Sequence, residues 1–476
     1  MRLPKPSRCA RLWAAWVFVV FGVMNAFGPP LEAWRRPDDQ PPASWLALRM
    51  RQNPLERFLT TLRDDSDVER YFAYAQATLG RPYAADFVRP AGATGDGDRP
   101  DPSRVVTPER PLVPWREFVV EYPPGMMAAA LLPAFLTGDE GAYVRLFALE
   151  MEIALTLAVW LAAQTADRLR PGAGEDALGH ATVLTLALGI IAVRRYDPLV
   201  ALTVAAAVHA LAARRFAVSG AALALGIVVK GAPILLAPIF VLYAVKRRDW
   251  RGLVQGAAGG GATLALAALA YFAIAGPHGL DALAYHGARP VQIETVYSGL
   301  VLAGQALGLG PVASHWGYGS LNLATDSEPL LRALSTALLA AALFAIWLAA
   351  GRRLAAARDD KERLLTVALA SLAALGAFIT LGKVFSPQYC VWLIPLAAVA
   401  APFVDAQARR ILTIGFALVQ AEYPFLYPLL YGRLTPAAGL LILARTACLW
   451  AYGLRAWRGA PELAGRPEPA GRSEAA

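Results

Sequence analysis

The chain has 476 residues, of which 57% are hydrophobic and only 17% are charged, and its mean hydropathy is +0.42. A soluble globular protein carries roughly 25% charged residues, and here apolar runs recur from Ala142 almost to the C-terminus. This pattern excludes the series of soluble domains that the length alone would suggest. It predicts an all-α polytopic membrane protein with one continuous helical bundle.

The net charge of +9 would normally suggest a nucleic-acid partner. Most lysines and arginines, however, stand in short clusters between apolar runs, as the positive-inside bias of membrane proteins requires. We therefore expect no nucleic acid, and a chain surrounded by membrane lipids. Of the three cysteines, Cys390 and Cys448 lie in apolar segments and Cys9 lies in a basic tail, so neither a disulfide framework nor a redox role is indicated.

Residues 1–28 are predicted to form a cytoplasmic tail and a first transmembrane anchor. The apolar segment 13–27 follows a basic stretch and therefore resembles a signal sequence, but no small-x-small cleavage site precedes Pro29 and Pro30. We interpret it as an uncleaved anchor that leaves the N-terminus in the cytoplasm.

Residues 29–141 are predicted to form a long extracytoplasmic loop with juxtamembrane helices. Apolar residues at helical spacing indicate an amphipathic surface helix over 41–63, and residues 91–114 form an irregular insertion rich in Gly, Pro, Asp and Arg. The apolar stretch 122–136 contains three prolines and is shorter than the roughly 20 residues that a span needs. If it crossed the membrane, every later basic cluster would face outward, so we expect a re-entrant or surface helix.

Residues 142–456 are predicted to form the transmembrane bundle, interrupted by an outer loop over 277–328. Together with the first anchor, the apolar segments give about 12 transmembrane helices and place both termini in the cytoplasm. The tail 457–476 is expected to be disordered, because it is dominated by Ala, Gly, Pro, Glu and Arg. The later spans are expected over residues 142–164, 177–193, 198–213, 216–229, 233–245, 252–275, 329–350, 364–380, 389–403, 411–431 and 435–452.

This topology leaves five cations on the outer side, against the positive-inside bias. For any one of them alone, a structural explanation is as good as a functional one: a lysine at a helix end snorkels to the interface, and Arg195 forms a structural pair with Asp197. A charge at the bilayer centre costs about 2.5 to 3.5 kcal/mol, so Lys230, which lies between apolar residues, requires a partner or a polar cavity. Together the five predict an anion site at the outer membrane boundary. They are Arg194, Arg195, Lys230, Arg289 and Lys383.

An anion at this boundary suggests a lipid phosphate, and the acidic first loop suggests the other half of a reaction. When a sugar is transferred from a polyprenyl phosphate, the leaving phosphate needs charge stabilisation more than a general acid, and Arg and Lys provide it. The accepting hydroxyl must lose a proton, for which one Asp is sufficient. Residue type alone does not choose among the carboxylates, because a charge run is usually a solvated face. The candidates are Asp64, Asp65, Asp67, Asp86 and Glu121.

Several short motifs, each weak alone, are fairly specific in their order along the chain. The motifs are Ser66-Asp67-Val68 with Tyr71, Gly80-Arg81-Pro82-Tyr83 with Asp86-Phe87, Glu121-Tyr122-Pro123-Pro124, Arg195-Tyr196-Asp197, Lys230 with Pro233, His286 with Arg289-Pro290 and Gln292, and Lys383-Val384-Phe385-Ser386-Pro387-Gln388-Tyr389. Through them the sequence resembles, over most of its length, the polyprenyl-phosphate-dependent mannosyltransferases of glycosyltransferase family 87, within the GT-C superfamily of membrane glycosyltransferases. The insertion 91–114 departs from the compact pattern of that family.

The resemblance implies a GT-C-like bundle in which Asp67 is the catalytic base of an inverting transfer. It implies that Arg195-Tyr196-Asp197 matches a second acidic site, which orients substrate or, in some members, helps to hold a metal. It also favours contacts of His286 and Arg289 with the donor phosphate. No His/Asp spacing argues for a metal here, so no cofactor is expected. The expected substrate-binding residues are Asp86, Glu121, Tyr122, Arg195, Asp197, Lys230, His286, Arg289, Lys383 and Gln388.

The leading hypothesis is an inverting glycosyltransferase at the outer face of the plasma membrane. It would move a sugar, mannose by the resemblance, from a polyprenyl-phosphate donor to a lipid or glycan acceptor. The alternative is a transporter or flippase of a lipid-linked sugar, because short, proline-interrupted segments also mark transport sites. A third possibility is a non-catalytic scaffold, which predicts that Asp67 lies more than about 15 Å from every outward cation.

Overall fold

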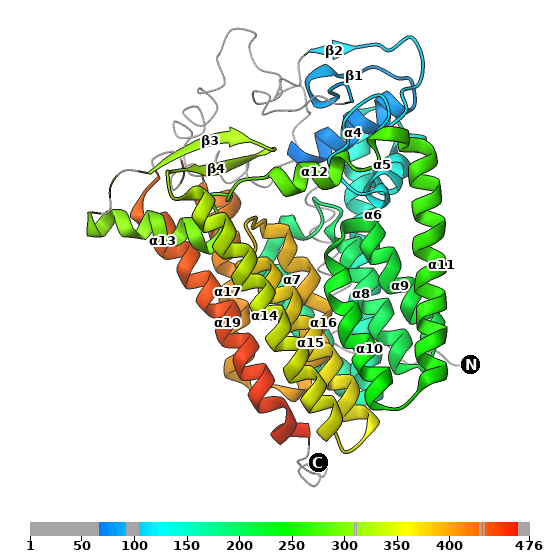
Figure 1. Ribbon diagram of the computed structural model, residues 1–476, viewed down its shortest axis with the longest axis vertical. Helices are drawn as coiled ribbons and strands as arrows, with labels where there is room; N and C mark the ends of the chain where they lie inside the picture. The colour runs from blue at the N-terminus through cyan, green and yellow to red at the C-terminus, as the bar shows by residue number, and fades with distance from the viewer. Residues whose placement is uncertain are drawn as a thin grey trace, which may run out of the picture.

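The computed structural model describes residues 66–91, 104–308, 310, 312–427, 431 and 434–464. The predicted first anchor and the amphipathic helix over 41–63 lie outside these residues, as does half of the insertion 91–114, namely residues 92–103. Within them the chain is mainly helical, and the long helices lie side by side in one bundle (Figure 1).

Six of the described helices are long and apolar enough to cross a membrane. Three of them begin with an aspartate cap, in which the carboxylate of Asp139, Asp249 or Asp359 accepts a backbone N–H of the first turn. Such a cap satisfies a donor that the start of a helix leaves open. The six are α6 (Glu140–Leu169), α7 (Ala173–Leu188, continued by the 3-10 turn η3, Gly189–Ala192), α11 (Trp250–Ala275), α14 (Glu328–Ala356), α15 (Asp360–Leu381) and α19 (Pro436–Ala464).

Shorter helices complete the bundle, and the described residues of each span predicted from residue 142 onward fall on one or more helical elements. The last helix, α19, continues to Ala464, past residue 457, where the sequence predicts the start of a disordered tail. The shorter helices are α8 (Asp197–Ala212), α9 (Phe216–Lys230), η4 (Ala232–Leu236), α10 (Ala237–Lys246), η7 (Pro387–Trp392), α16 (Leu393–Ala400), η8 (Ala401–Phe403), α17 (Ala406–Gln420) and the π-helical segment η9 (Ala421–Leu426).

The segments predicted as outer loops gather at one end of the bundle, at the top of Figure 1. There α4 (Ser66–Thr78) packs on α5 (Pro124–Leu136). The 13 residues of α5 measure about 20 Å at 1.5 Å per residue, which is less than the ~30 Å hydrocarbon core. Its length therefore agrees with the predicted helix that does not cross.

Two small two-stranded sheets, which the sequence analysis did not predict, lie at the same end of the bundle (Figure 1). The strands pair antiparallel, with Tyr83 opposite Val106 in the first sheet and Trp316 opposite Leu321 in the second, which is a hairpin. The outer loop 277–328 thus has its own structure. The remaining elements are β1 (Tyr83–Ala84), η2 (Ala85–Phe87), β2 (Val105–Val106), η5 (Gly276–His278), α12 (Asp281–Ala288), α13 (Val296–Gly304), η6 (Gln305–Leu307), β3 (Ala313–Gly317) and β4 (Ser320–Ala324).

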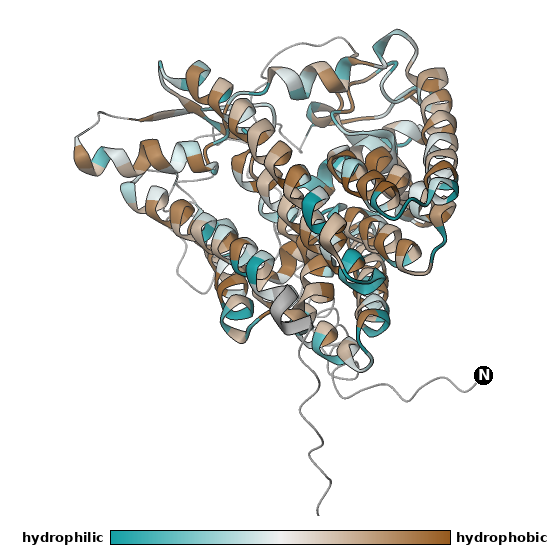
Figure 2. Ribbon diagram, turned by 60° about the horizontal axis from the view of Figure 1, so that its bottom comes forward, coloured by the Kyte–Doolittle hydropathy of each residue, from teal (hydrophilic) through white to brown (hydrophobic). Residues whose placement is uncertain are grey.

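The bundle has a buried centre and an apolar outer surface. In the most apolar 18-residue stretch of each helix, 78% of the residues are buried in α15, against 17% in α14 and none in α11. Leu266 and Leu269 of α11 are 69% and 71% exposed, and apolar residues colour much of the outer helices in Figure 2. An exposed apolar surface on this scale suits lipid rather than water. The prediction of an all-α polytopic membrane protein is confirmed, whereas the number of about 12 spans stays a prediction.

The outermost helix α11 is held against α9 by close backbone contact. A Cβ atom on Gly220 would stand 2.0 Å from the carbonyl oxygen of Gly256, so a side chain at this position would force the two helices apart. Small residues serve this purpose in membrane helices, where lipid supplies no hydrophobic force between them.

Candidate active site

Asp67 lies in the first turn of α4, at the end of the bundle that carries the outer loops. Its Oδ2 atom stands 2.6 Å from Nε of Arg195, which comes from the turn before α8. The Asp67 side chain is 28% exposed, whereas that of Arg195 is 6% exposed. This contact joins the predicted base to a predicted outward cation and contradicts the wide separation that a non-catalytic scaffold predicts.

Three tyrosines form a triangle beside this ion pair. The ring centroids of Tyr71 lie 5.6 Å from Tyr122 and 5.7 Å from Tyr196, and those of Tyr122 and Tyr196 lie 5.6 Å apart, all edge to face. Burial, followed by the Asp67 charge, raises the pKa of Tyr122. The hydroxyl of Tyr196 is buried and has no hydrogen-bond partner among the described residues. The three rings thus form one aromatic surface, on which the Tyr196 hydroxyl is available to a ligand.

Lys230, at the end of α9, has the partner that a lysine in apolar surroundings requires. Its Nζ lies 2.8 and 3.0 Å from the two carboxylate oxygens of Asp197, which is fully buried. Trp392 donates its indole N–H to the same carboxylate at 2.7 Å. The ammonium also faces the rings of Tyr196 and Tyr389 at 4.5 and 4.7 Å. Lys230 and Asp197 therefore form a buried ion pair next to Tyr196.

Glu121, the residue before Tyr122, binds two arginines. Its carboxylate oxygens stand 2.6 Å from Nη1 of Arg70 and 3.0 Å from Nη2 of Arg89. Burial alone would raise the pKa of this carboxyl, but the charges of Arg70 and Arg89 outweigh it and the pKa is lowered. Neither arginine was among the predicted site residues. Arg70 belongs to the same turn of helix as Asp67, and this spacing could have indicated it.

The outer loop 277–328 covers this cluster. Nε2 of His286 lies 2.9 Å from the backbone carbonyl oxygen of Glu121, and Arg289 donates from Nη2 to the Ser320 hydroxyl at 3.1 Å. At the tip of the β3–β4 hairpin, a Cβ atom on Gly319 would stand 3.1 Å from Nη1 of Arg70. The loop therefore lies directly against α4.

Arg289 and Lys383 differ from the cations described above, each of which is paired with a carboxylate. Lys383 donates from Nζ to the Gly287 carbonyl oxygen at 2.7 Å, and in the described part of the chain no carboxylate forms an ion pair with either residue. Nε of Arg289 is buried without a partner among those residues. Partial burial and the charges of Arg332 and Arg289 lower the pKa of Lys383. Crowded cations without a carboxylate are suited to an anionic ligand.

Two predicted residues lie apart from these contacts. Asp86, in η2, forms an ion pair with Arg104 at 3.8 Å, and Gln388 is half-buried in η7 next to Tyr389. The described residues contain no group of three or more His, Cys, Asp or Glu side chains that could hold a metal ion.

Comparison with known proteins finds a matching family model and similar solved structures. The family model described as Glycosyltransferase family 87 matches residues 118–378. Among solved structures, ArnT from Cupriavidus metallidurans bound to undecaprenyl phosphate is 14% identical in sequence, with 89% of this chain and 79% of that chain covered and a TM-score of 0.41. The apo state of ArnT gives 13% identity, coverage of 88% and 78%, and a TM-score of 0.39. A search of curated proteins finds no match.

Proposed function

Since the chain belongs to glycosyltransferase family 87 and is a membrane glycosyltransferase, we propose that it transfers mannose from a polyprenyl-phosphate donor to a lipid or glycan hydroxyl, with inversion at the anomeric carbon. The exposure of Asp67 carries this proposal. In the cluster, the side chain of Asp67 is 28% exposed, that of Glu121 is 8% exposed and that of Asp197 is not exposed at all. Of these three carboxylates, Asp67 alone is open to a substrate hydroxyl.

Asp67 acts as the general base. The acceptor oxygen forms a bond to the anomeric carbon while its proton passes to the Asp67 carboxylate, and the bond from that carbon to the phosphate oxygen breaks. Arg195 holds Oδ2 of Asp67 at 2.6 Å, which fixes the direction of the carboxylate. A base positioned in this way contributes about 10² to 10⁴ in rate.

Arg289 and Lys383 bind the phosphate. The leaving phosphate already carries negative charge, so it requires cations rather than a proton donor, and charge-assisted hydrogen bonds from guanidinium and ammonium groups are the strong ones. Both side chains now bond to neutral oxygens, on Ser320 and Gly287. A phosphate oxygen can replace these acceptors without breaking an ion pair.

The other charged residues position the reacting groups. Lys230 and Asp197 fix Tyr196, whose buried hydroxyl is available to a sugar hydroxyl. Glu121 holds Arg70 and Arg89 in place beneath the outer loop. We place this site at the outer face of the plasma membrane. The turns that carry basic residues, such as α10–α11 and α14–α15, lie at the opposite end of the bundle (Figure 1), as the positive-inside bias requires.

Transfer from labelled polyprenyl-phosphate mannose to membrane acceptors tests the base. We expect Asp67→Asn to lower turnover by about 10² to 10⁴ and to leave binding of the donor intact. Glu117→Gln is the matched control, because Glu117 has a similar side-chain exposure of 26% and a different partner, Arg110. Normal turnover of Asp67→Asn would remove the base assignment.

Two further measurements test phosphate binding by Lys383 and the transporter alternative. Lys383→Met should raise the donor KM, with a smaller change in kcat, because it removes charge from the donor site. Counter-flow of labelled lipid-linked sugar in proteoliposomes without any product would favour a flippase instead.

A further inference from the structure

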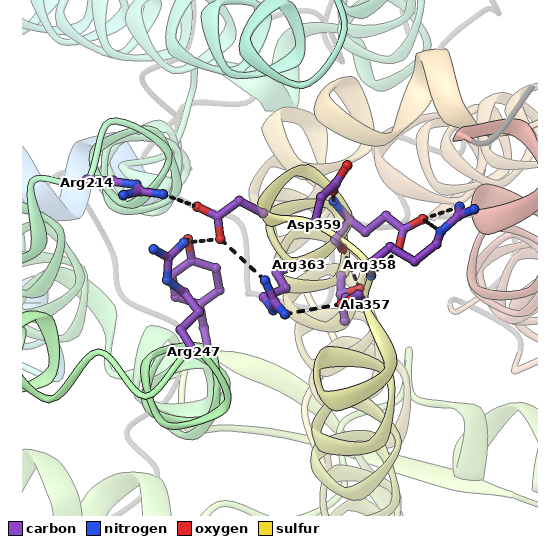
Figure 3. A network of polar contacts seen from close by, with 10 residues as sticks. Arg214, Arg247, Ala357, Arg358, Asp359 and Arg363 are labelled. Atoms are coloured by element: carbon purple, nitrogen blue, oxygen red, sulfur yellow. Dashed lines mark hydrogen bonds and ion pairs between the residues drawn. The ribbon is translucent and has the colours of Figure 1, made fainter. Parts of the chain in front are cut away.

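A second cluster of arginines lies at the end of the bundle opposite the candidate active site. Asp360, the first residue of α15, receives guanidinium groups from three different segments (Figure 3). Nη2 of Arg214, from the α8–α9 turn, lies 3.0 Å away, and Nη1 of Arg363 lies 3.9 Å away. Arg247, from the α10–α11 turn, contacts the same carboxylate. One negative charge thus stands among three positive charges.

The surroundings of Asp360 carry more positive than negative charge. Four further cations on the same two turns are exposed or carry no ion pair with any described residue, and the nearby Asp249 is engaged in capping α11. With Arg214, Arg247 and Arg363 they make seven cations against four carboxylates, of which Asp249 and Asp359 cap helices, Glu362 is bound to Arg358, and Asp360 is the fourth. The four are Arg215, Lys246, Arg248 and Arg251.

The backbone conformation of two arginines in this cluster is not explained by the positive-inside bias alone. Arg214 and Arg248 both have a left-handed backbone, with φ of 56° and 58°, at helix ends where glycine is the usual residue. A non-glycine residue is strained in this conformation, and the favourable interaction of a cation with a helix C-terminus offsets only part of that strain. The positive-inside bias requires charge but no particular backbone geometry. The two arginines are therefore placed at a net local cost.

We propose that Arg214, Arg247 and Arg363 form, around Asp360, a binding site for the phosphate of an anionic phospholipid headgroup. Planar guanidinium groups bind phosphate oxygens in pairs, and basic pockets between the inner ends of transmembrane helices accept such headgroups. The first turns of α9 and α11 beside the cluster expose Val218 and Trp250 at 55% and 60%. An apolar rim with a tryptophan is typical of the membrane interface, which favours a lipid over a free phosphate ion.

The test uses the full chain in nanodiscs of phosphatidylcholine, with and without phosphatidylglycerol. The wild type should unfold at a higher temperature when phosphatidylglycerol is present, because a ligand of the folded state stabilises it. Arg214→Gly should unfold at a higher temperature than the wild type in phosphatidylcholine, because glycine relieves the left-handed backbone. The same variant should retain phosphatidylglycerol about fivefold more weakly in native mass spectrometry. A misfolded variant cannot produce these two opposite effects.

Arg358→Gln is the matched control. Arg358 lies on the α14–α15 turn of the same network, is 71% exposed and is bound to Glu362, so its removal should leave the phosphatidylglycerol effect unchanged. If Arg358→Gln loses as much phosphatidylglycerol as Arg214→Gly does, the lipid responds to general surface charge and the proposed site is wrong. The proposed site is also wrong if Arg214→Gly retains as much phosphatidylglycerol as the wild type. A temperature shift produced by inorganic phosphate in phosphatidylcholine nanodiscs would overturn the assignment to lipid.

Discussion

Glu121 and Asp360 are both single carboxylates that gather arginines from distant segments, yet their surroundings differ. Glu121 and its partner Arg70 are 8% and 12% exposed, beneath the outer loop. Asp360 and its partner Arg214 are 29% and 64% exposed, at the rim of the bundle. The buried pair holds elements together, whereas the open pair leaves positive charge available to a ligand. The same contact can thus serve two purposes, and burial decides which.

Removal of the buried carboxylate should have the largest effect. Glu121→Gln leaves Arg70 and Arg89 without their charge partner in a site closed to water, and breaking a buried pair in this way costs about 3–5 kcal/mol. Thermal unfolding in nanodiscs should show this loss, together with loss of transfer activity because α4 carries Asp67. A cost below about 1 kcal/mol would mean that Glu121 behaves as an exposed group.

The same pair should make stability depend on pH. The pKa of Glu121 is lowered in the folded chain, so its ionised form stabilises the fold above the unfolded pKa of about 4.3, and this contribution is lost as the pH falls through the folded pKa. The wild type should therefore lose more stability than Glu121→Gln between neutral pH and acid. Parallel curves of unfolding temperature against pH for the two proteins would contradict the lowered pKa.

The sequence predicted the bundle well because hydropathy is a local property. The helices α6 and α15 cover the segments predicted as spans, and the short apolar stretch before residue 136 is the 13-residue helix α5. It also predicted that Lys230 needs a partner or a polar cavity. The identity of that partner, Asp197 on a different helix, follows from the packing of α8 on α9 and not from either segment alone.

What the sequence analysis missed depends on contacts between distant segments. Arg89 joins the site only because the first loop folds back onto Glu121, 32 residues later. The β3–β4 hairpin carries a local signal, since Tyr318 and Gly319 at its tip both have positive φ and a glycine there is typical of a tight turn. Its contact with Arg70 has no such signal, because it requires the outer loop to lie on α4.

The hairpin contact gives a test of intermediate size. Gly319 has a φ of +70° and lies against Arg70, whereas Gly308 has a φ of +77° and no atom within 4 Å of an added Cβ. Gly308→Ala should cost only the left-handed backbone penalty of roughly 1–2 kcal/mol. Gly319→Ala should cost more and should also lower transfer activity, because its Cβ pushes Arg70 away from Glu121. Equal costs and equal activity would show that the hairpin does not hold the buried pair.

Asp360→Asn should have the smallest effect on stability. Ion pairs that remain in contact with water are worth roughly 0–1 kcal/mol, and the three arginines around Asp360 can be hydrated once the carboxylate is gone. The substitution also removes one negative charge from a basic site, so retention of phosphatidylglycerol in nanodiscs should increase while the unfolding temperature in phosphatidylcholine changes little. A loss as large as that of Glu121→Gln would mean that the rim network is as essential to the fold as the buried one. The distinction between a closed structural pair and an open binding pair depends on this result.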